Sequence, residues 1–293
     1  MTAFFEILLG GVFHAAVLFL VAAGLQLVFG VQKIVNLACG SFYALGAYFG
    51  ITSVNWALAA GLPPSLFLPV LLVSGIVVGA IGPAIEALLR TVYARDEAFQ
   101  LLLTFALVLM FQDVLRFFWG PNPQQLGNLA IGYGRLSSGA FSIPTYNVLV
   151  IAASIAIAVG IGAFLQRTRF GRILRATAEN REMSQALGVD VRFVYASVFT
   201  LGTMLGTVGG ALVVPTAAAS LDMPVELVVE AFAVVVIGGL GSMRGALVGA
   251  LIVGLMRAAA ITFYAELEIL AIYLVVIVVL IARPAGLFGK PIE

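Results

Sequence analysis

The sequence predicts an all-α integral membrane protein, a polytopic helical bundle of about eight to ten transmembrane helices that forms one domain over residues 1–293. Three observations predict this class. Hydrophobic residues make up 62% of the chain and charged residues 10%, whereas soluble chains carry about 45–50% and about 25%. The mean hydropathy is +1.14. Long apolar stretches recur along the whole chain, and no stretch is polar enough to form a separate soluble domain.

The apolar stretches define the expected helices, because about 20 apolar residues are needed to cross a bilayer. No basic region precedes the first stretch, so we interpret it as a retained helix rather than a signal peptide. The second stretch is rich in glycine and polar residues, and the seventh and eighth are separated only by 241–245. We therefore expect Gly-interrupted helices and one half-helix or re-entrant segment. The spans are expected at about 7–30, 34–54, 66–89, 98–118, 145–166, 194–214, 227–242, 246–264 and 267–283.

The basic residues predict the orientation, because short cytoplasmic loops are enriched in Lys and Arg. Six arginines lie between the fifth and sixth spans, so this loop, about 167–193, is expected in the cytoplasm. Counting spans outward from it places the N-terminus outside and the C-terminus in the cytoplasm. Arg135, in the long outer loop 119–143, is the exception. The six are Arg167, Arg169, Arg172, Arg175, Arg181 and Arg192.

The cytoplasmic loop is expected to contain two short helices. Residues 173–178 favour the first, and the apolar positions Met183, Ala186 and Leu187 have the i, i+3, i+4 spacing of an amphipathic second helix. Gly188 stands where a helix C-cap is expected. Such an element docks on another protein or lies on the lipid surface.

Several chemistries are excluded by composition. Cys39 is the only cysteine and His14 the only histidine, which excludes intrachain disulfides, cysteine metal clusters, His-pair metal sites and the usual catalytic triads. We expect no metal, no cofactor, no catalytic residues and no nucleic-acid partner. For His14 we expect a structural hydrogen bond.

Polar residues within the spans are candidates for lining a path through the membrane. Candidates for lining the path are Gln26, Asn36, Cys39, Gly40, Ser41 and Tyr43, because a broken helix would expose backbone groups to the solute. A bond from Asn36 to a neighbouring helix is the competing interpretation. The span centres contain almost no carboxylates, which favours ATP-driven transport over ion coupling. An ion-gradient-driven secondary transporter or channel is the alternative.

Four strings of residues, in order, resemble one known family. Gly171-Arg172-x-x-Arg175-Ala176-x-Ala-Glu179-Asn180, followed by Ala186-Leu187-Gly188, resembles the coupling loop of permeases from ABC importers, and specifically the LivH-like permeases for branched-chain amino acids. The resemblance covers nearly the whole chain. The other three strings are Gly24-Leu-x-Leu-x-Phe-Gly30 with Asn36-Leu-Ala-x-Gly40-x-Phe42, Ala231-Phe-x-Val-Val-Val-x-Gly-Gly-Leu-Gly-Ser242, and Arg283-Pro-x-Gly-Leu-Phe-Gly289.

The resemblance implies a non-catalytic permease subunit in the bacterial inner membrane. It implies two cytoplasmic ATPase subunits docked on the coupling loop, which bind the ATP, a second (sister) permease and an extracytoplasmic solute-binding protein. The substrate would be a branched-chain or hydrophobic amino acid, or a related small polar solute such as urea, an amide or a small carboxylate. This chain itself has no GxxxxGK[ST] phosphate-binding loop.

The chain departs from the family pattern in two places. LivH-like chains carry a histidine and an acidic residue where Cys39 and Ser41 stand, which puts the identity of the solute in doubt. They tend to carry a base at position 230 and an acid at 257, whereas this chain has Glu230 and Arg257. Because an unpaired charge in the membrane is costly, we predict that Glu230 and Arg257 face each other as a structural ion pair. A contact between Arg257 and an anionic substrate is the rival interpretation.

Overall fold

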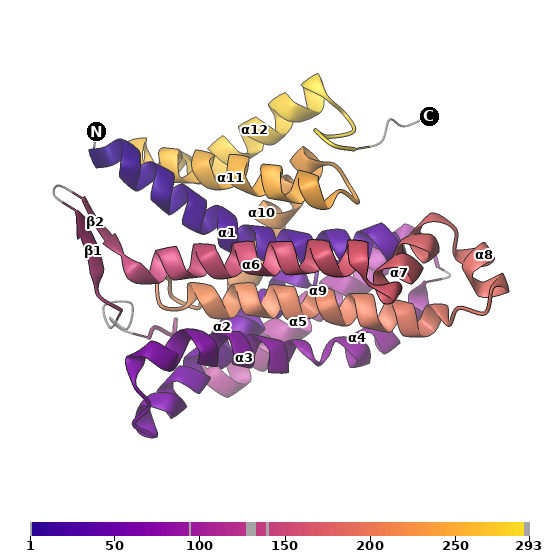
Figure 1. Ribbon diagram of the computed structural model, residues 1–293, viewed down its shortest axis with the longest axis horizontal. Coiled ribbons are helices and arrows are strands. Elements are labelled where there is room, and N and C mark those ends of the chain that lie inside the picture. The colour runs from indigo at the N-terminus through magenta and orange to yellow at the C-terminus, as the bar shows by residue number, and fades with distance from the viewer. Residues whose placement is uncertain (1, 94, 127–132, 139–140, 290–293) are drawn as a thin grey trace.

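The computed structural model describes residues 2–93, 95–126, 133–138 and 141–289. Most of its helices run lengthwise beside one another (Figure 1). Their bounds are α1 Thr2–Gln32, α2 Cys39–Ala59, α3 Phe67–Gly79, α4 Gly82–Leu89, α5 Glu97–Trp119, α6 Thr145–Arg167, α7 Arg169–Glu179, α8 Arg181–Ala186, α9 Val191–Val213, α10 Met223–Gly238, α11 Met243–Phe263 and α12 Glu268–Ala282. Short 3-10 helices lie at Pro64–Leu66, Arg90–Val92 and Ala265–Leu267, and strands β1 Arg135–Ser138 and β2 Phe141–Pro144 form an antiparallel hairpin in the loop between α5 and α6.

In the described residues, six segments are long and apolar enough to cross a membrane: 7–32, 64–92, 97–119, 145–167, 191–213 and 243–263. A shorter apolar helix covers 270–282. Helix α2 has 21 residues but is not one of these six segments. It contains many small and polar side chains, and most of its residues are buried against other helices. The predicted class, a helical membrane bundle, is confirmed.

Helix α9 lies at the centre and packs against α1, α2, α3 and α4. Glycines allow this close packing. A Cβ built on Gly46 of α2 would lie 1.9 Å from the carbonyl oxygen of Thr207, and one on Gly24 of α1 would lie 2.5 Å from that of Gly202. Only a residue without a side chain fits such contacts, as is usual between helices in lipid.

Two threonines of α9 use this close approach for hydrogen bonds to α3. Thr203 Oγ1 lies 3.0 Å from the Gly79 carbonyl oxygen, and Thr207 Oγ1 lies 2.6 Å from that of Gly75. Both hydroxyls are also within reach of carbonyls one turn back in α9. The structure therefore gives each hydroxyl a partner on another helix as well as one on its own.

The irregular part of the second span, expected over 34–54, is confined to its first residues. Helix α2 is continuous from Cys39 to Ala59, and the irregular stretch, 33–38, precedes it. The third span is the interrupted one, with α3 ending at Gly79 and α4 beginning at Gly82. Pro83, in the first turn of α4, has no N–H to donate to the preceding turn, which explains the interruption.

The seventh and eighth spans begin and end earlier than expected. Positive φ angles at Gly239 (95°) and Gly241 (81°) end α10 at Gly238, so that α11 begins at Met243. With 16 residues, α10 is about 24 Å long. It is therefore shorter than the roughly 30 Å hydrocarbon layer and is the short helix that the sequence suggests.

The two ends of the bundle differ. Helices α7 and α8 project from one end, whereas the β1–β2 hairpin and the start of α1 lie at the other (Figure 1). A pocket at the α7–α8 end is lined by Gly30, Glu179, Leu240 and Pro284, among others, so α1, α10 and α12 all finish there. The described part of the chain therefore begins at one end of the bundle and finishes at the other.

Candidate functional site

The α7–α8 projection is built by local capping. Thr168 Oγ1 accepts from the Gly171 backbone N–H at 3.0 Å and begins α7, and Asn180 Oδ1 accepts from the Met183 N–H at 2.9 Å and begins α8. A Cβ on Gly171 would lie 2.3 Å from the Leu165 carbonyl oxygen, so glycine is required where α7 folds back on α6. Gly188, at φ 84°, ends α8. The two short helices and their C-cap agree with the expectation from the sequence.

One face of this projection is buried and the other is open. Gly171, Leu174 and Thr177 of α7 and Ser184 of α8 face the bundle. Phe170 contacts Phe193 of α9, and the Arg181 guanidinium lies 5.4 Å from the centre of the Tyr195 ring, which ties α8 to α9. The remaining predicted coupling residues are all exposed: Arg172, Arg175, Ala176, Glu179, Asn180, Ala186, Leu187 and Gly188.

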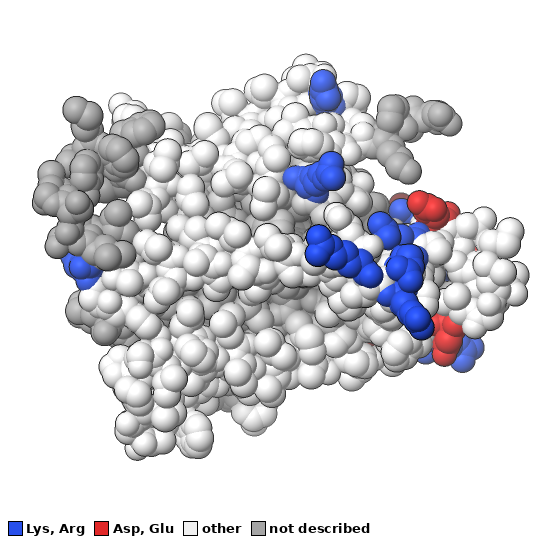
Figure 2. Space-filling view, in the orientation of Figure 1, with Lys and Arg blue, Asp and Glu red and all other residues white. Residues whose placement is uncertain are grey.

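The open face combines apolar side chains with arginines. Met183 is 59% exposed and Leu187 77% exposed, outside the apolar body of the bundle. Arginines and a few carboxylates gather at this end of the visible face, which is otherwise nearly free of charge (Figure 2). Two exposed apolar side chains on short anchored helices that also carry exposed arginines are typical of a surface that docks into a groove on a protein.

A polar network lies beneath this surface. Gln32 of α1 donates to the Tyr195 carbonyl oxygen at 2.9 Å, and the Tyr93 hydroxyl lies 3.3 Å from Gln32 Oε1 and 3.2 Å from Glu86 Oε1. Glu86, fully buried, also pairs with Arg90. Burial and the Glu86 carboxylate raise the pKa of the Tyr93 phenol, so it remains a hydrogen-bond donor. Sequence reasoning missed this network, although the i, i+4 spacing of Glu86 and Arg90 is a signal for it.

Gln26, the first candidate for the solute path, binds backbone instead. Its amide nitrogen donates to the Gly239 carbonyl oxygen at 2.9 Å, and its amide oxygen accepts from the Gly241 N–H at 2.5 Å. The side chain is 2% exposed and holds the α10–α11 turn against α1. Both ends of the amide therefore have partners in this conformation.

The other five path candidates are also buried. Asn36 Oδ1 accepts from the Ala38 N–H at 3.0 Å and stabilises the turn that leads into α2, rather than bonding a neighbouring helix. Gly40 allows α2 to approach α10, since its Cβ would lie 2.0 Å from the Pro224 carbonyl oxygen. Cys39, Ser41 and Tyr43 are buried beside it, and the Ser41 hydroxyl has no hydrogen-bond partner among the described residues.

A charged cluster lies in the half of the bundle away from α7–α8. Arg257 Nη1 lies 2.6 Å from Glu230 Oε1, and Arg257 Nε pairs with Glu268 at the start of α12. His14 Nε2 lies 2.8 Å from Glu230 Oε2 and 2.9 Å from Arg257 Nη1, so the state of the imidazole decides which of them it bonds. The structure thus brings Glu230 and Arg257 together and makes His14 part of the same hydrogen-bonded group.

The cluster borders a half-open pocket of about 300 Å³. Its wall combines apolar side chains with three carboxylates and one guanidinium, so both an apolar and a charged part of a small molecule would find contacts there. The lining residues are Val225, Glu226, Val229, Glu230, Arg257, Glu268, Ile272 and Tyr273. Glu226, Glu268 and Tyr273 are site residues that sequence reasoning missed.

The sequence of this chain is similar to those of known proteins over most of its length. Residues 7–282 match the family described as Branched-chain amino acid transport system / permease component. The chain belongs to this family. It is 26% identical over 288 residues to the high-affinity branched-chain amino acid transport system permease protein BraD of Pseudomonas aeruginosa, covering 93% of this chain and 91% of that protein.

Two further relatives show the breadth of the similarity. The probable branched-chain amino acid transport permease protein LivH of Methanocaldococcus jannaschii is 29% identical over 268 residues, covering 88% of this chain and 81% of the relative. The fructose import permease protein FrcC of Rhizobium meliloti is 28% identical over 273 residues, covering 85% and 72%. The resemblance to permeases of ABC transporters is confirmed, and this chain is an integral membrane permease component.

Proposed function

We propose that this permease is the membrane-spanning subunit of an ATP-driven importer and forms the path for branched-chain amino acids or a related small polar solute. The α7–α8 projection is the observation that carries the proposal. Its two helices are capped and anchored, and they expose Met183 and Leu187 as well as arginines. The projection is therefore suited to transmit the movement of cytoplasmic ATPase subunits to α6 and α9. The orientation follows: α7–α8 and the end of α12 in the cytoplasm, and the start of α1 outside, in a bacterial inner membrane.

The partners follow from the same arrangement. Two ATPase subunits would dock on α7–α8 of this chain and of a sister permease, and an extracytoplasmic binding protein would deliver the solute at the hairpin end. Gln26, Asn36, Cys39, Gly40, Ser41 and Tyr43 are all buried in this conformation. A role in the path for the α2 residues Cys39, Gly40, Ser41 and Tyr43 therefore requires α2 to shift against α10, and the Ser41 hydroxyl, which has no partner among the described residues, is the group that such a shift would make available to a solute.

The solute class is favoured by the family and by the charged pocket. Proteins named for branched-chain amino acid transport match this chain over most of its length, and import permeases for fructose and ribose also match. A wall with valines, an isoleucine and carboxylates suits an apolar zwitterion better than a sugar, which needs many neutral hydrogen-bonding groups.

A gradient-driven carrier is the second candidate, and one observation favours it. His14 and Glu230 are titratable groups in contact inside the membrane, an arrangement that proton-coupled carriers use. The two candidates differ in what powers uptake, so one experiment separates them.

The test is purification of the full chain from its native membrane in mild detergent, followed by identification of the proteins that co-purify. We expect an ATPase in the complex and its loss on Arg175→Glu. In proteoliposomes, the complex should take up leucine only with ATP. Reversal of both charges, with Arg175→Glu and Glu179→Arg, should uncouple hydrolysis from uptake while the bundle stays folded. Normal transport by this double variant, or uptake by the chain alone under an ion gradient, would overturn the proposal.

A further inference from the structure

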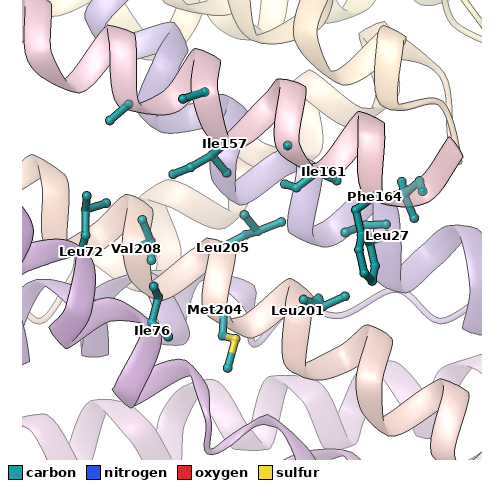
Figure 3. Close-up of a pocket in the computed structure, with 14 residues that line it drawn as sticks. Leu27, Leu72, Ile76, Ile157, Ile161, Phe164, Leu201, Met204, Leu205 and Val208 are labelled. Atoms are coloured by element: carbon teal, nitrogen blue, oxygen red, sulfur yellow. The ribbon is translucent and has the colours of Figure 1, made fainter. Parts of the chain in front are cut away.

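An apolar groove of about 460 Å³ lies between α6 and α9, with α1 at its base and α3 along one side. Helix α6 packs mainly on α1 and on α7, which leaves this groove open beside it (Figure 3). In Figure 3, Leu72 and Val208 stand at one end of the groove, and Phe164, Leu27 and Leu201 at the end that leads toward α7. Its lining contains only apolar side chains and Gly160, so it is not a path for a polar solute.

The groove has the dimensions of one lipid tail. On α6 it extends from Ala153 to Leu165, which is about 18 Å of helix. One leaflet of the hydrocarbon layer is about 15 Å thick. A single acyl chain matches this length, and the open space around Gly160 on the groove gives it room beside α6.

The end of the groove nearest α7 is positively charged. Arg167 continues the helical row of Ala153 and Gly160 at seven-residue spacing, so it follows the groove on the same face of α6. Arg169 begins α7, where Phe170 contacts Phe164 of the groove. In the described part of the chain, the ion pairs involve neither of these arginines. Both residues are exposed, which makes them available to an anion at the membrane surface.

We propose that this groove holds one acyl chain of an anionic phospholipid, whose phosphate is bound by Arg167 and Arg169. The apolar length and the charged mouth are the two halves of a phospholipid in one leaflet, and basic pockets at the ends of transmembrane helices bind such headgroups. The site adjoins α6, α9 and the turn into α7, so a bound lipid would brace the base of the α7–α8 projection. Only the assignment to the cytoplasmic leaflet rests on the proposed function.

The test is a titration of the full chain in detergent with phosphatidylglycerol, and in parallel with phosphatidylcholine of the same acyl chains, followed by native mass spectrometry. We expect the unaltered chain to retain one phosphatidylglycerol, and to bind it about fivefold more tightly than phosphatidylcholine. Gly160→Leu should weaken both lipids about tenfold, because its side chain fills the groove. Gly162→Leu is the matched control, since it also lies on α6 with open space around it but outside the groove.

Two further variants keep the result decisive. Ala156→Leu fills the groove from a second position, so loss of lipid in both filling variants, with unchanged melting temperatures, supports the site. Arg167→Gln should lower the affinity for phosphatidylglycerol about fivefold and leave phosphatidylcholine unaffected. Unchanged lipid retention by Gly160→Leu and Ala156→Leu would overturn the proposal. So would a dimer of this chain that both variants dissociate, because a second protein would then occupy the groove. Neither result bears on ATPase docking, so failure here is distinguishable from failure of the proposed function.

Discussion

Arg257 of α11 forms ion pairs with two carboxylates, Glu230 of α10 at 2.6 Å and Glu268 of α12, so one guanidinium links three helices. His14 of α1 contacts both members of the first pair. Glu230 and Arg257 lie at similar depths in their predicted spans. Because an isolated charge at that depth is costly, the sequence predicts that they meet. The contributions of Glu268 and His14 depend on how α12 and α1 fold onto the pair.

We expect Arg257→Gln to lower the free energy of unfolding by about 3–5 kcal/mol, because it leaves the largely buried Glu230 carboxylate without its cation. Glu268→Gln should cost less, since the side chain of Glu268 is more exposed, at 26% against 11% for Glu230. Thermal unfolding of the detergent-solubilised variants measures both changes. Equal losses of unfolding free energy in the two variants would show that burial of the carboxylates does not determine the cost of breaking these ion pairs.

Exchange of the two charges, with Glu230→Arg and Arg257→Glu, should restore only part of the stability. A carboxylate at position 257 would face Glu268 at the site where Arg257 now pairs with it. Adding Glu268→Gln should therefore recover more stability than the exchange alone, in the same unfolding measurement. Complete recovery by the exchange alone would mean that Glu268 does not interact with position 257 in the membrane.

We expect Gly210→Ala to destabilise the bundle by about 1–3 kcal/mol through overpacking. Its Cβ would lie 1.8 Å from the Tyr43 carbonyl oxygen, which forces α2 away from α9. Gly162→Ala is the control, because no atom lies within 4 Å of its Cβ. The control should unfold at or slightly above the unfolding temperature of the unaltered chain, since alanine has a higher helix propensity than glycine. A similar loss in both variants would point to a general cost of replacing glycine.

Gln26→Leu should lower the free energy of unfolding by about 2–4 kcal/mol, because it leaves the Gly239 carbonyl and the Gly241 N–H unpaired. Gln26→Glu keeps the acceptor for Gly241 but turns a buried carboxylate oxygen toward the Gly239 carbonyl oxygen, so we expect an effect at least as large. If Gln26 instead acts mainly on the solute, Gln26→Leu will abolish uptake with unchanged unfolding. Uptake and unfolding of both variants are therefore measured together.

Met183→Glu combined with Leu187→Glu should abolish co-purification of the ATPase and leave the unfolding temperature unchanged, because both side chains are largely exposed. Trp56→Ala is the matched control, since Trp56 is 71% exposed near the end of α2, away from α7–α8. Retention of the ATPase by the first variant, or its loss from the control, would contradict docking on α7–α8. Co-purification followed by immunoblotting reads out both.

The sequence predicts local features of this protein well where a single residue type decides the backbone. Gly188 ends α8 because its φ of 84° suits glycine, and Thr168 and Asn180 begin helices with their own side-chain oxygens. These choices need no knowledge of the remaining chain. The arginines of the 167–193 loop likewise predict a positively charged surface from the composition and length of the loop alone.

The sequence does not predict which way each transmembrane helix faces. This limits what it says about the site. In lipid, the outer face of a helix is as apolar as the inner face, so hydrophobic periodicity does not identify the neighbours. The polarity of Gln26 and Ser41 predicts a place along a solute path, whereas their burial is set by the helices that pack around them. The Gln32–Tyr93–Glu86 network joins residues up to 61 positions apart for the same reason.

The sequence by itself determines that this chain is a membrane bundle with a capped pair of short helices at one end, because composition, capping residues and glycine positions act locally. Only the tertiary structure decides which polar groups meet, how Arg257 is shared between Glu230 and Glu268, and where α6 leaves a groove. The physical reason is that these contacts depend on glycine-mediated approaches between distant helices, such as Gly24 to Gly202. Glycine spacing marks a helix that can pack closely, but it does not identify the helix that packs against it.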